Sequence, residues 1–110
     1  MKSGAGFKMF VEDQLGGLRG VVCRPMFGGY GIYQAQTFFG IIFRNQLYFK
    51  TSEATRGRYT KAGMKPFRPS AKQTLKNYYE VPGDVLEDPD ELVAWAQEAL
   101  HPGRLMVEGR

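Results

Sequence analysis

The segment from residue 26 to residue 50 constrains the fold more than any other part of this chain. Aromatic and β-branched residues dominate three runs, at positions 30–34, 37–43 and 47–50, and short gaps containing glycine or polar residues adjoin them. Such side chains fit the surface of a pleated sheet, and such gaps fit hairpin loops. The segment therefore predicts an antiparallel meander.

The strand predicted at residues 21–27 is expected either at an edge of the sheet or with the side of its proline turned away from a neighbouring strand. It contains Pro25, which has no backbone N–H to donate to a neighbouring strand. Gly28 and Gly29 follow it and suit the positive φ angles of a tight turn. A phosphate-binding loop is the alternative, but such loops lead into a helix, whereas this pair leads into a strand. We therefore interpret the two glycines as a hairpin turn.

The strand predicted at residues 37–43 is expected at the centre of the sheet. Apolar residues occupy both of its faces, which indicates that both faces are covered. Helices would cover one face, and a dimer partner is one candidate for the other. Strict alternation places Phe39, Ile41 and Phe43 on one face, and Phe38 and Ile42 on the other.

Three helices are predicted around the sheet. Residues 6–15 carry apolar side chains at helical spacing, and residues 53–62 follow a potential cap and precede a glycine. The last helix has the clearest start, because Asp88 suits the N-cap, Pro89 the first helical position and Glu91 a capping box. We expect this helix to end at residues 101–103.

The chain between the second and third helices is predicted to be extended. Residues 66–69 suit a short extended piece, and residues 70–72 suit a polar loop. Residues 75–81 are predicted as the last strand, which a turn at Pro82 and Gly83 would end. The fold class expected is therefore α+β, with an antiparallel meander flanked by N- and C-terminal helices.

The size and composition of the chain predict one domain over residues 1–110. We expect a core at about residues 6–100 and a loose tail at 101–110. Cys23 is the only cysteine, so an internal disulfide and a multi-cysteine zinc site are excluded. The first residues do not resemble a signal peptide, and no apolar run approaches the roughly 20 residues that span a bilayer. We expect a cytoplasmic protein without a membrane segment.

Charge is distributed unevenly along the chain. The net charge is +4, yet residues 51–76 contain seven Lys or Arg against Glu53, and residues 77–110 contain eight acids against two Arg. The basic segment interleaves with aromatic residues, as in nucleic-acid-binding surfaces, but charge runs are usually solvated faces, and the basic and acidic segments could also face each other in the fold or across a subunit boundary. The residues of this candidate surface for nucleic acid or an acidic partner are Arg56, Arg58, Lys61, Lys65, Arg68, Lys72 and Lys76.

The sequence offers little for catalysis. A nucleophilic pair would have to combine Cys23 with His101, the only histidine, which falls at a helix end with no evident orienting group. Acidic residues near position 88 are explained by helix capping and lack the spacing of a calcium loop. We predict no catalytic, cofactor-binding or metal residues. A small-molecule-binding domain or enzyme is the alternative, and it would need an aromatic pocket with a polar group such as Tyr33, Tyr48 or Tyr78.

Several short motifs together resemble a known family. They are Met-Phe-Gly-Gly-Tyr-Gly-Ile-Tyr at residues 26–33, Leu-Tyr-Phe-Lys at 47–50, Pro-Phe at 66–67, Tyr-Tyr-Glu-Val-Pro at 78–82, Trp-Ala at 95–96 and Ala-Leu at 99–100. In this combination the chain resembles the N-terminal domain of the TfoX/Sxy competence regulators, from about residue 11 to residue 100.

The resemblance implies a compact α+β domain similar to secretion-chaperone-like folds, with a tendency to form homodimers. It also implies a non-enzymatic role without a cofactor, because full-length members are thought to be transcriptional coactivators that work with the cyclic-AMP receptor protein at competence promoters. Those longer regulators have a second, C-terminal domain, so a stand-alone domain with a protein partner in transcription is expected here.

Overall fold

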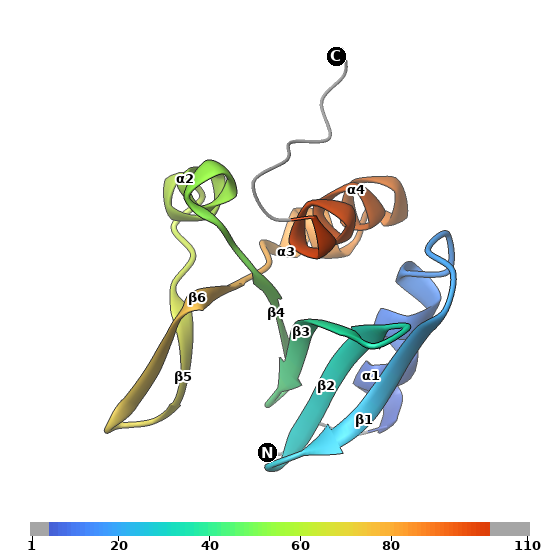
Figure 1. Ribbon diagram of the computed structural model, residues 1–110, viewed down its shortest axis with the longest axis horizontal. Coiled ribbons are helices and arrows are strands. Elements are labelled where there is room, and N and C mark those ends of the chain that lie inside the picture. Colours follow the sequence, from blue (N-terminus) through green and yellow to red (C-terminus); the bar gives the residue numbers. More distant parts are fainter. Residues whose placement is uncertain (1–4, 102–110) are drawn as a thin grey trace.

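The computed structural model describes residues 5–101, and within this range the chain forms one antiparallel sheet with four helices (Figure 1). The sheet order is β1-β2-β3-β4-β6-β5, and every neighbouring pair is antiparallel. The predicted α+β class is confirmed. The strands are β1 (Val21–Met26), β2 (Gly29–Gln34), β3 (Thr37–Phe43), β4 (Gln46–Lys50), β5 (Pro66–Ser70) and β6 (Gln73–Glu80), and the helices are α1 (Ala5–Gln14), α2 (Glu53–Lys61), α3 (Gly83–Leu86) and α4 (Pro89–Leu100).

The predicted places of β1 and β3 are confirmed, since β1 lies at an edge and β3 lies inside the sheet. The other edge is β5, which carries Pro66 and Pro69. Prolines discourage a further strand from pairing with an edge, because they lack an N–H to donate. Two predictions differ from the structure. Ser70 was predicted as loop but belongs to β5, and the turn predicted at Pro82 and Gly83 begins the short helix α3.

A hairpin turn joins β1 to β2 as predicted, but it lies one residue earlier than expected, because Gly29 belongs to β2 and has no positive φ angle. Phe27 and Gly28 form it, with φ angles of 20° and 85°, and only glycine adopts the second value without strain. Gly29 is needed for a different reason, because a Cβ at this position would overlap the carbonyl oxygen of Ile42 on β3. Gly28 therefore permits the tight turn, and Gly29 permits the close approach of the β2 backbone to β3.

The expected alternation along β3 is wrong at Phe39. The pairing of β2 with β3 shifts between Ile32 and Tyr33, which leaves one extra residue in β3. Because of this bulge, Phe39 shares a face with Ile42 rather than with Ile41 and Phe43. Phe38 lies with the latter two, so the predicted grouping of the five apolar side chains changes.

The helices cover one face of the sheet, which we call the helix face. Its core contains Phe39, Ile42, Leu47 and Phe49 from the strands. Apolar residues of the helices pack onto them, with Val11 from α1, Val85 from α3, and Leu92 and Ala96 from α4. In Figure 1, α2 and α4 lie side by side at the top, and the rings of Tyr59 on α2 and Trp95 on α4 are 4.8 Å apart.

The sheet curls over its other face, which we call the concave face. The ring centroids of Phe27, next to edge strand β1, and Phe67, on edge strand β5, are only 6.2 Å apart. Adjacent strands are about 4.8 Å apart, so the edges of a flat six-stranded sheet would lie roughly 24 Å from each other. The curl buries Ile41, Tyr48 and Phe67 between the two halves of the sheet. The second cover expected for β3 thus comes from the chain itself.

The start of α4 agrees with its predicted cap. The Asp88 carboxylate accepts hydrogen bonds from the backbone N–H groups of Asp90, at 3.2 Å, and Glu91, at 3.3 Å. Pro89 occupies the first helical position, and His101 follows the last one. The remaining part of the predicted tail, residues 102–110, lies outside the described range. Within residues 5–101, each helix is too short or too polar to cross a bilayer.

Candidate binding face

The floor of the concave face is a packed group of aromatic rings. Phe67 is fully buried at its centre, with Tyr48 at 4.7 Å, Phe43 at 5.3 Å and Phe27 at 6.2 Å between ring centroids. These rings come from β5, β4, β3 and the turn between β1 and β2, so four separate parts of the sheet meet here. The curl of the sheet is what brings them together.

Phe27 is the exposed member of this group. Its residue surface is 56% accessible, and its ring stacks on Phe67 with an angle of 19° between the ring planes. Beside it lies a hollow of about 370 Å³. This first hollow is lined by Phe27, Phe43, Pro69, Gln73 and Leu75. One wall therefore comes from the β1–β2 turn and the end of β3, and the other from the β5–β6 hairpin.

A second hollow, of about 310 Å³, lies further along β5 and is more polar. The Tyr48 hydroxyl donates a hydrogen bond to Gln46 Oε1 at 2.9 Å, and Gln46 Nε2 donates to Glu80 Oε2 at 3.1 Å. Burial raises the pKa of the Tyr48 hydroxyl, and the nearby Glu80 charge adds to this effect. Burial likewise raises the pKa of Glu80. The lining residues are Gln46, Tyr48, Lys65, Pro66, Arg68 and Glu80.

Cations border the concave face and lie over some of its rings. The Arg44 guanidinium carbon is 5.1 Å from the centroid of Phe43, which lines the first hollow. On the β1 side, the Arg24 guanidinium carbon is 5.6 Å from the centroid of Tyr33. Lys65 and Arg68 line the second hollow together with the acid Glu80. Positive charge therefore exceeds negative charge around these aromatic side chains.

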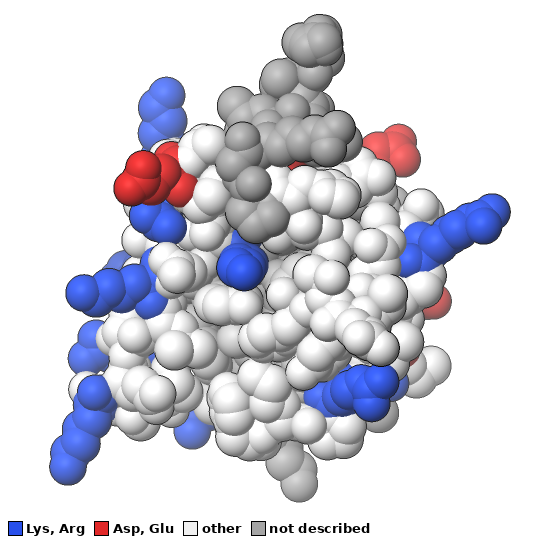
Figure 2. Space-filling view, in the orientation of Figure 1, with Lys and Arg blue, Asp and Glu red and all other residues white. Residues whose placement is uncertain are grey.

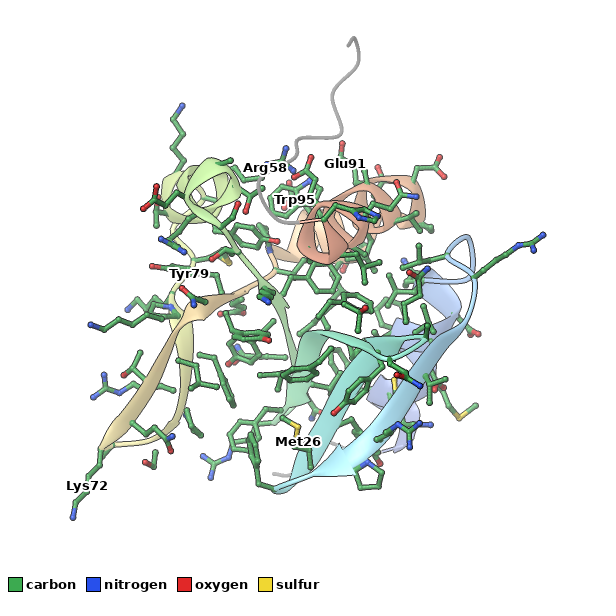
Figure 3. The ribbon with its side chains drawn as sticks, in the orientation of Figure 1. Met26, Arg58, Lys72, Tyr79, Glu91 and Trp95 are labelled. Carbon is green, nitrogen blue, oxygen red and sulfur yellow. The ribbon has the colours of Figure 1, made fainter. Side chains whose placement is uncertain are left out.

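The predicted basic surface divides into two parts in the structure. Arg58 lies on α2 beside Trp95 (Figure 3), where its guanidinium carbon is 4.5 Å from the Trp95 ring centroid and its Nη1 is 3.0 Å from Glu98 Oε1. The Glu98 side chain is only 6% exposed, so this pair joins α2 to α4. Arg56 donates hydrogen bonds to Thr51 Oγ1 and Asn77 Oδ1. Both arginines therefore make contacts within the protein.

The other five predicted cations are exposed. Lys72 occupies the tip of the β5–β6 hairpin, far from Arg58 in Figure 3. Figure 2 shows blue side chains along the edge that α2, β6 and β5 form. Arg68 also braces the hairpin, because it donates hydrogen bonds to Thr74 Oγ1 at 3.4 Å and to the carbonyl oxygen of Ala71 at 3.1 Å. The exposed group comprises Lys61, Lys65, Arg68, Lys72 and Lys76.

Sequence reasoning missed three residues of the concave face, namely Phe27, Arg24 and Arg44. Phe27 was predicted as the last residue of a strand and not as part of a binding surface, and the two arginines lie outside the basic segment. A usable signal existed for Arg44, because it directly follows the aromatic end of one predicted strand and precedes another. Its φ of 52° shows that it forms the β3–β4 turn, which holds it next to Phe43.

The Cys23 thiol is poorly suited to act as a nucleophile. It is half buried on β1, and burial raises its pKa to about 11, with a further contribution from the Glu12 charge. A reactive cysteine needs the opposite shift, because the thiolate is the nucleophile. His101 lies at the end of α4, where its backbone N–H donates to the Gln97 carbonyl oxygen.

The three tyrosines considered for a small-molecule pocket have different surroundings. Tyr48 lines the second hollow, whereas Tyr33 and Tyr78 each pack against the Phe38 ring, at 5.2 Å and 5.5 Å between centroids. Burial raises the pKa of the Tyr78 hydroxyl, and the Tyr33 hydroxyl adds to this effect. In the range 5–101, no three His, Cys, Asp or Glu side chains are grouped so as to hold a metal ion.

Comparison with known proteins supports the family that the motifs suggested. The chain is 29% identical over 87 residues to "DNA transformation protein TfoX1" of Aliivibrio fischeri. This match covers 77% of the chain and 42% of the relative, so the chain spans well under half of that protein. A sequence profile described as the TfoX N-terminal domain matches residues 13–102. Because this match covers most of the chain, the protein belongs to the TfoX N-terminal domain family.

Proposed function

We propose that this protein is a non-enzymatic regulatory domain in the control of DNA uptake, and that it acts by binding a partner. The proposal is supported by the family and by the name of the relative, a DNA transformation protein. The chain matches only 42% of that relative, so the role that its name states is extended here to the part of it that the chain matches.

The structural observation that carries the proposal is the exposed Phe27 ring above a packed aromatic floor. A large apolar side chain that stays 56% exposed beside a hollow is typical of a binding surface. The candidate chemical groups point away from catalysis. The Cys23 thiol has a raised pKa, and the Tyr48 hydroxyl is engaged with Gln46.

The regulatory role can be tested in the organism that encodes the chain. Deletion of the gene should lower transcript levels of the DNA-uptake genes and the frequency of transformation, and the wild-type gene should restore both. Phe27→Ser should fail to restore them although the protein accumulates normally. Phe10→Ser, which changes an exposed phenylalanine on α1, is the control and should restore both. Unchanged transcripts and transformation in the deletion strain would reject the proposal.

We also propose that the protein forms a homodimer and contacts a protein partner in transcription. Edge strand β1 pairs with β2 on one side only and exposes Val22, so a second copy could extend the sheet along residues 21–24, before Pro25. Light scattering should give twice the mass of the chain. Val22→Lys should give the mass of a monomer. Ala54→Lys, which changes an exposed residue of α2, should leave the dimer intact. A monomeric wild-type protein would reject the dimer.

A further inference from the structure

The concave face combines three features, namely an exposed aromatic ring, hollows beside packed rings, and cations. It has an exposed aromatic ring, Phe27, and two hollows that β5 helps to line. It has cations that lie over rings, as Arg44 does over Phe43. Both hollows are lined in part by β5, with Arg68 in the polar hollow and Pro69 in the apolar one. Two hollows that share one strand suit an extended ligand with repeating flat and anionic groups.

We infer that the concave face binds single-stranded nucleic acid, with one base in the hollow beside Phe27 and the adjoining phosphates near Arg44 and Arg68. Bases stack on aromatic side chains whatever their sequence, because every base has a flat π-face. Arginine and lysine along the same groove neutralise the phosphates. This inference goes beyond the proposed regulatory role, and it does not depend on a protein partner or on a dimer.

The polar hollow adds hydrogen-bonding groups for a second base. Glu80 accepts a hydrogen bond from Gln46, and its second carboxylate oxygen can accept one from an exocyclic amino group of cytosine or adenine. Lys65 and Arg68 line the same hollow and supply the charge for a phosphate. The hollow is therefore suited to a nucleotide, in which a hydrogen-bonding base and an anion are linked.

A single strand fits this face better than a duplex. In a duplex the bases are paired and stacked inside, so their flat faces cannot reach a ring such as Phe27. The walls formed by the β1–β2 turn and the β5–β6 hairpin also recess the first hollow. An acidic peptide would match the cations, but it would leave the exposed Phe27 ring without a flat partner.

The inference can be tested by fluorescence anisotropy with the full chain and a labelled single-stranded oligonucleotide of ten nucleotides that contains both cytidine and thymidine. Binding should weaken as salt is raised, with a slope of about −2 to −3 in a plot of log K against log salt, as three or four neutralised phosphates require. A duplex of equal length should bind more weakly. Binding that is absent or independent of salt would overturn the inference.

Two pairs of variants test where the strand lies. Phe27→Ala should weaken binding about ten- to a hundredfold through loss of stacking, whereas Phe10→Ala should change it little. Phe27→Leu, which keeps apolar bulk without a π-face, should resemble Phe27→Ala. Arg44→Gln should reduce the salt slope by about 0.7, whereas Arg19→Gln, also exposed but on the loop before β1, should not. Equal effects within each pair would mean diffuse attraction and would overturn the inference.

Two further controls separate this inference from its alternatives. Circular dichroism should show that Phe27→Ala remains folded, since the side chain is mostly exposed. Poly-glutamate of similar length should compete poorly with the oligonucleotide. If poly-glutamate binds as tightly as the oligonucleotide, and Phe27→Ala does not weaken the binding of poly-glutamate, the face serves an acidic protein partner and the inference fails. The transformation assay is a separate measurement. The nucleic-acid inference can therefore fail while the regulatory proposal stands, and the reverse is also possible.

Discussion

Gly29 lies so close to the Ile42 carbonyl oxygen that a Cβ on Gly29 would overlap this oxygen. The contact lets the β1–β2 turn bend toward the end of β3, where Phe27 and Phe43 line one hollow. The shape of the candidate binding face therefore depends on a backbone position that only glycine can occupy without strain.

Replacing Gly29 by alanine should destabilise the protein. The added Cβ forces β2 away from the Ile42 carbonyl, at a cost of about 1–3 kcal/mol in the free energy of unfolding. Urea denaturation measures this cost. Gly57→Ala is the matched control, because a Cβ on this residue of α2 meets nothing within 4 Å and alanine favours helix, so it should add about 0.5–1 kcal/mol. Equal effects of the two variants would contradict the close approach.

Removing the Arg58 charge should weaken the contact between α2 and α4. Arg58→Met removes the cation that pairs with Glu98, whose side chain is 6% exposed, and that lies over the Trp95 ring. The expected cost is about 1–2 kcal/mol in the free energy of unfolding. Thermal and urea unfolding at neutral pH measure the change. The control is Lys8→Met, which removes the more exposed bridge to Glu12 on α1 and should cost at most about 0.5 kcal/mol. A smaller loss for Arg58→Met than for the control would contradict the structure.

The Cys23 thiol should react slowly at neutral pH. Burial raises its pKa from 9.0 to about 11, so alkylation by iodoacetamide should keep accelerating up to about pH 11 in the folded protein. In urea the alkylation rate should level off near the ordinary pKa of a cysteine thiol, 9.0. The raised pKa also means that the contribution of the protonated Cys23 thiol to the free energy of unfolding is complete below about pH 9 and is lost as the pH rises toward 11. Cys23→Ala should reduce that loss, and an alkylation plateau below pH 9 in the folded protein would disprove the shift.

Removing the cap of α4 should cost a predictable amount. Asp88→Ala leaves the N–H groups of Asp90 and Glu91 without the carboxylate, and the expected loss is about 1 kcal/mol in the free energy of unfolding. Asp88→Ser keeps a capping oxygen and should recover most of the stability. If alanine and serine are equivalent in denaturant titrations, the cap contributes nothing.

The secondary structure was largely predictable because it depends on neighbours along the chain. The runs around Phe39 and Phe49 predict strands through their side-chain types, and Asp88 with Pro89 predicts the start of a helix through local hydrogen bonding. Helix α3 was missed because a helix of four residues gives too short a pattern. The bulge that moves Phe39 to the helix face was missed because nothing in the local alternation marks an extra residue.

The candidate site was only partly predictable, because cations close in sequence have different surroundings. Arg58 and Arg68 belong to the same basic segment, yet Arg58 pairs with Glu98 and Arg68 lines a hollow. Which partner each finds depends on how α4 and β6 pack, and no spacing in the sequence encodes this.

By itself, the sequence determined the fold class, the edge position of the strand with Pro25 and the family, since these depend on local preferences and short motifs. Only the tertiary structure decided that Phe27 meets Phe67, at 6.2 Å between ring centroids. The physical reason is that sheet twist accumulates over all the strands that separate them. A small rotation at each pair becomes a curl that joins distant residues, and this curl forms the concave face.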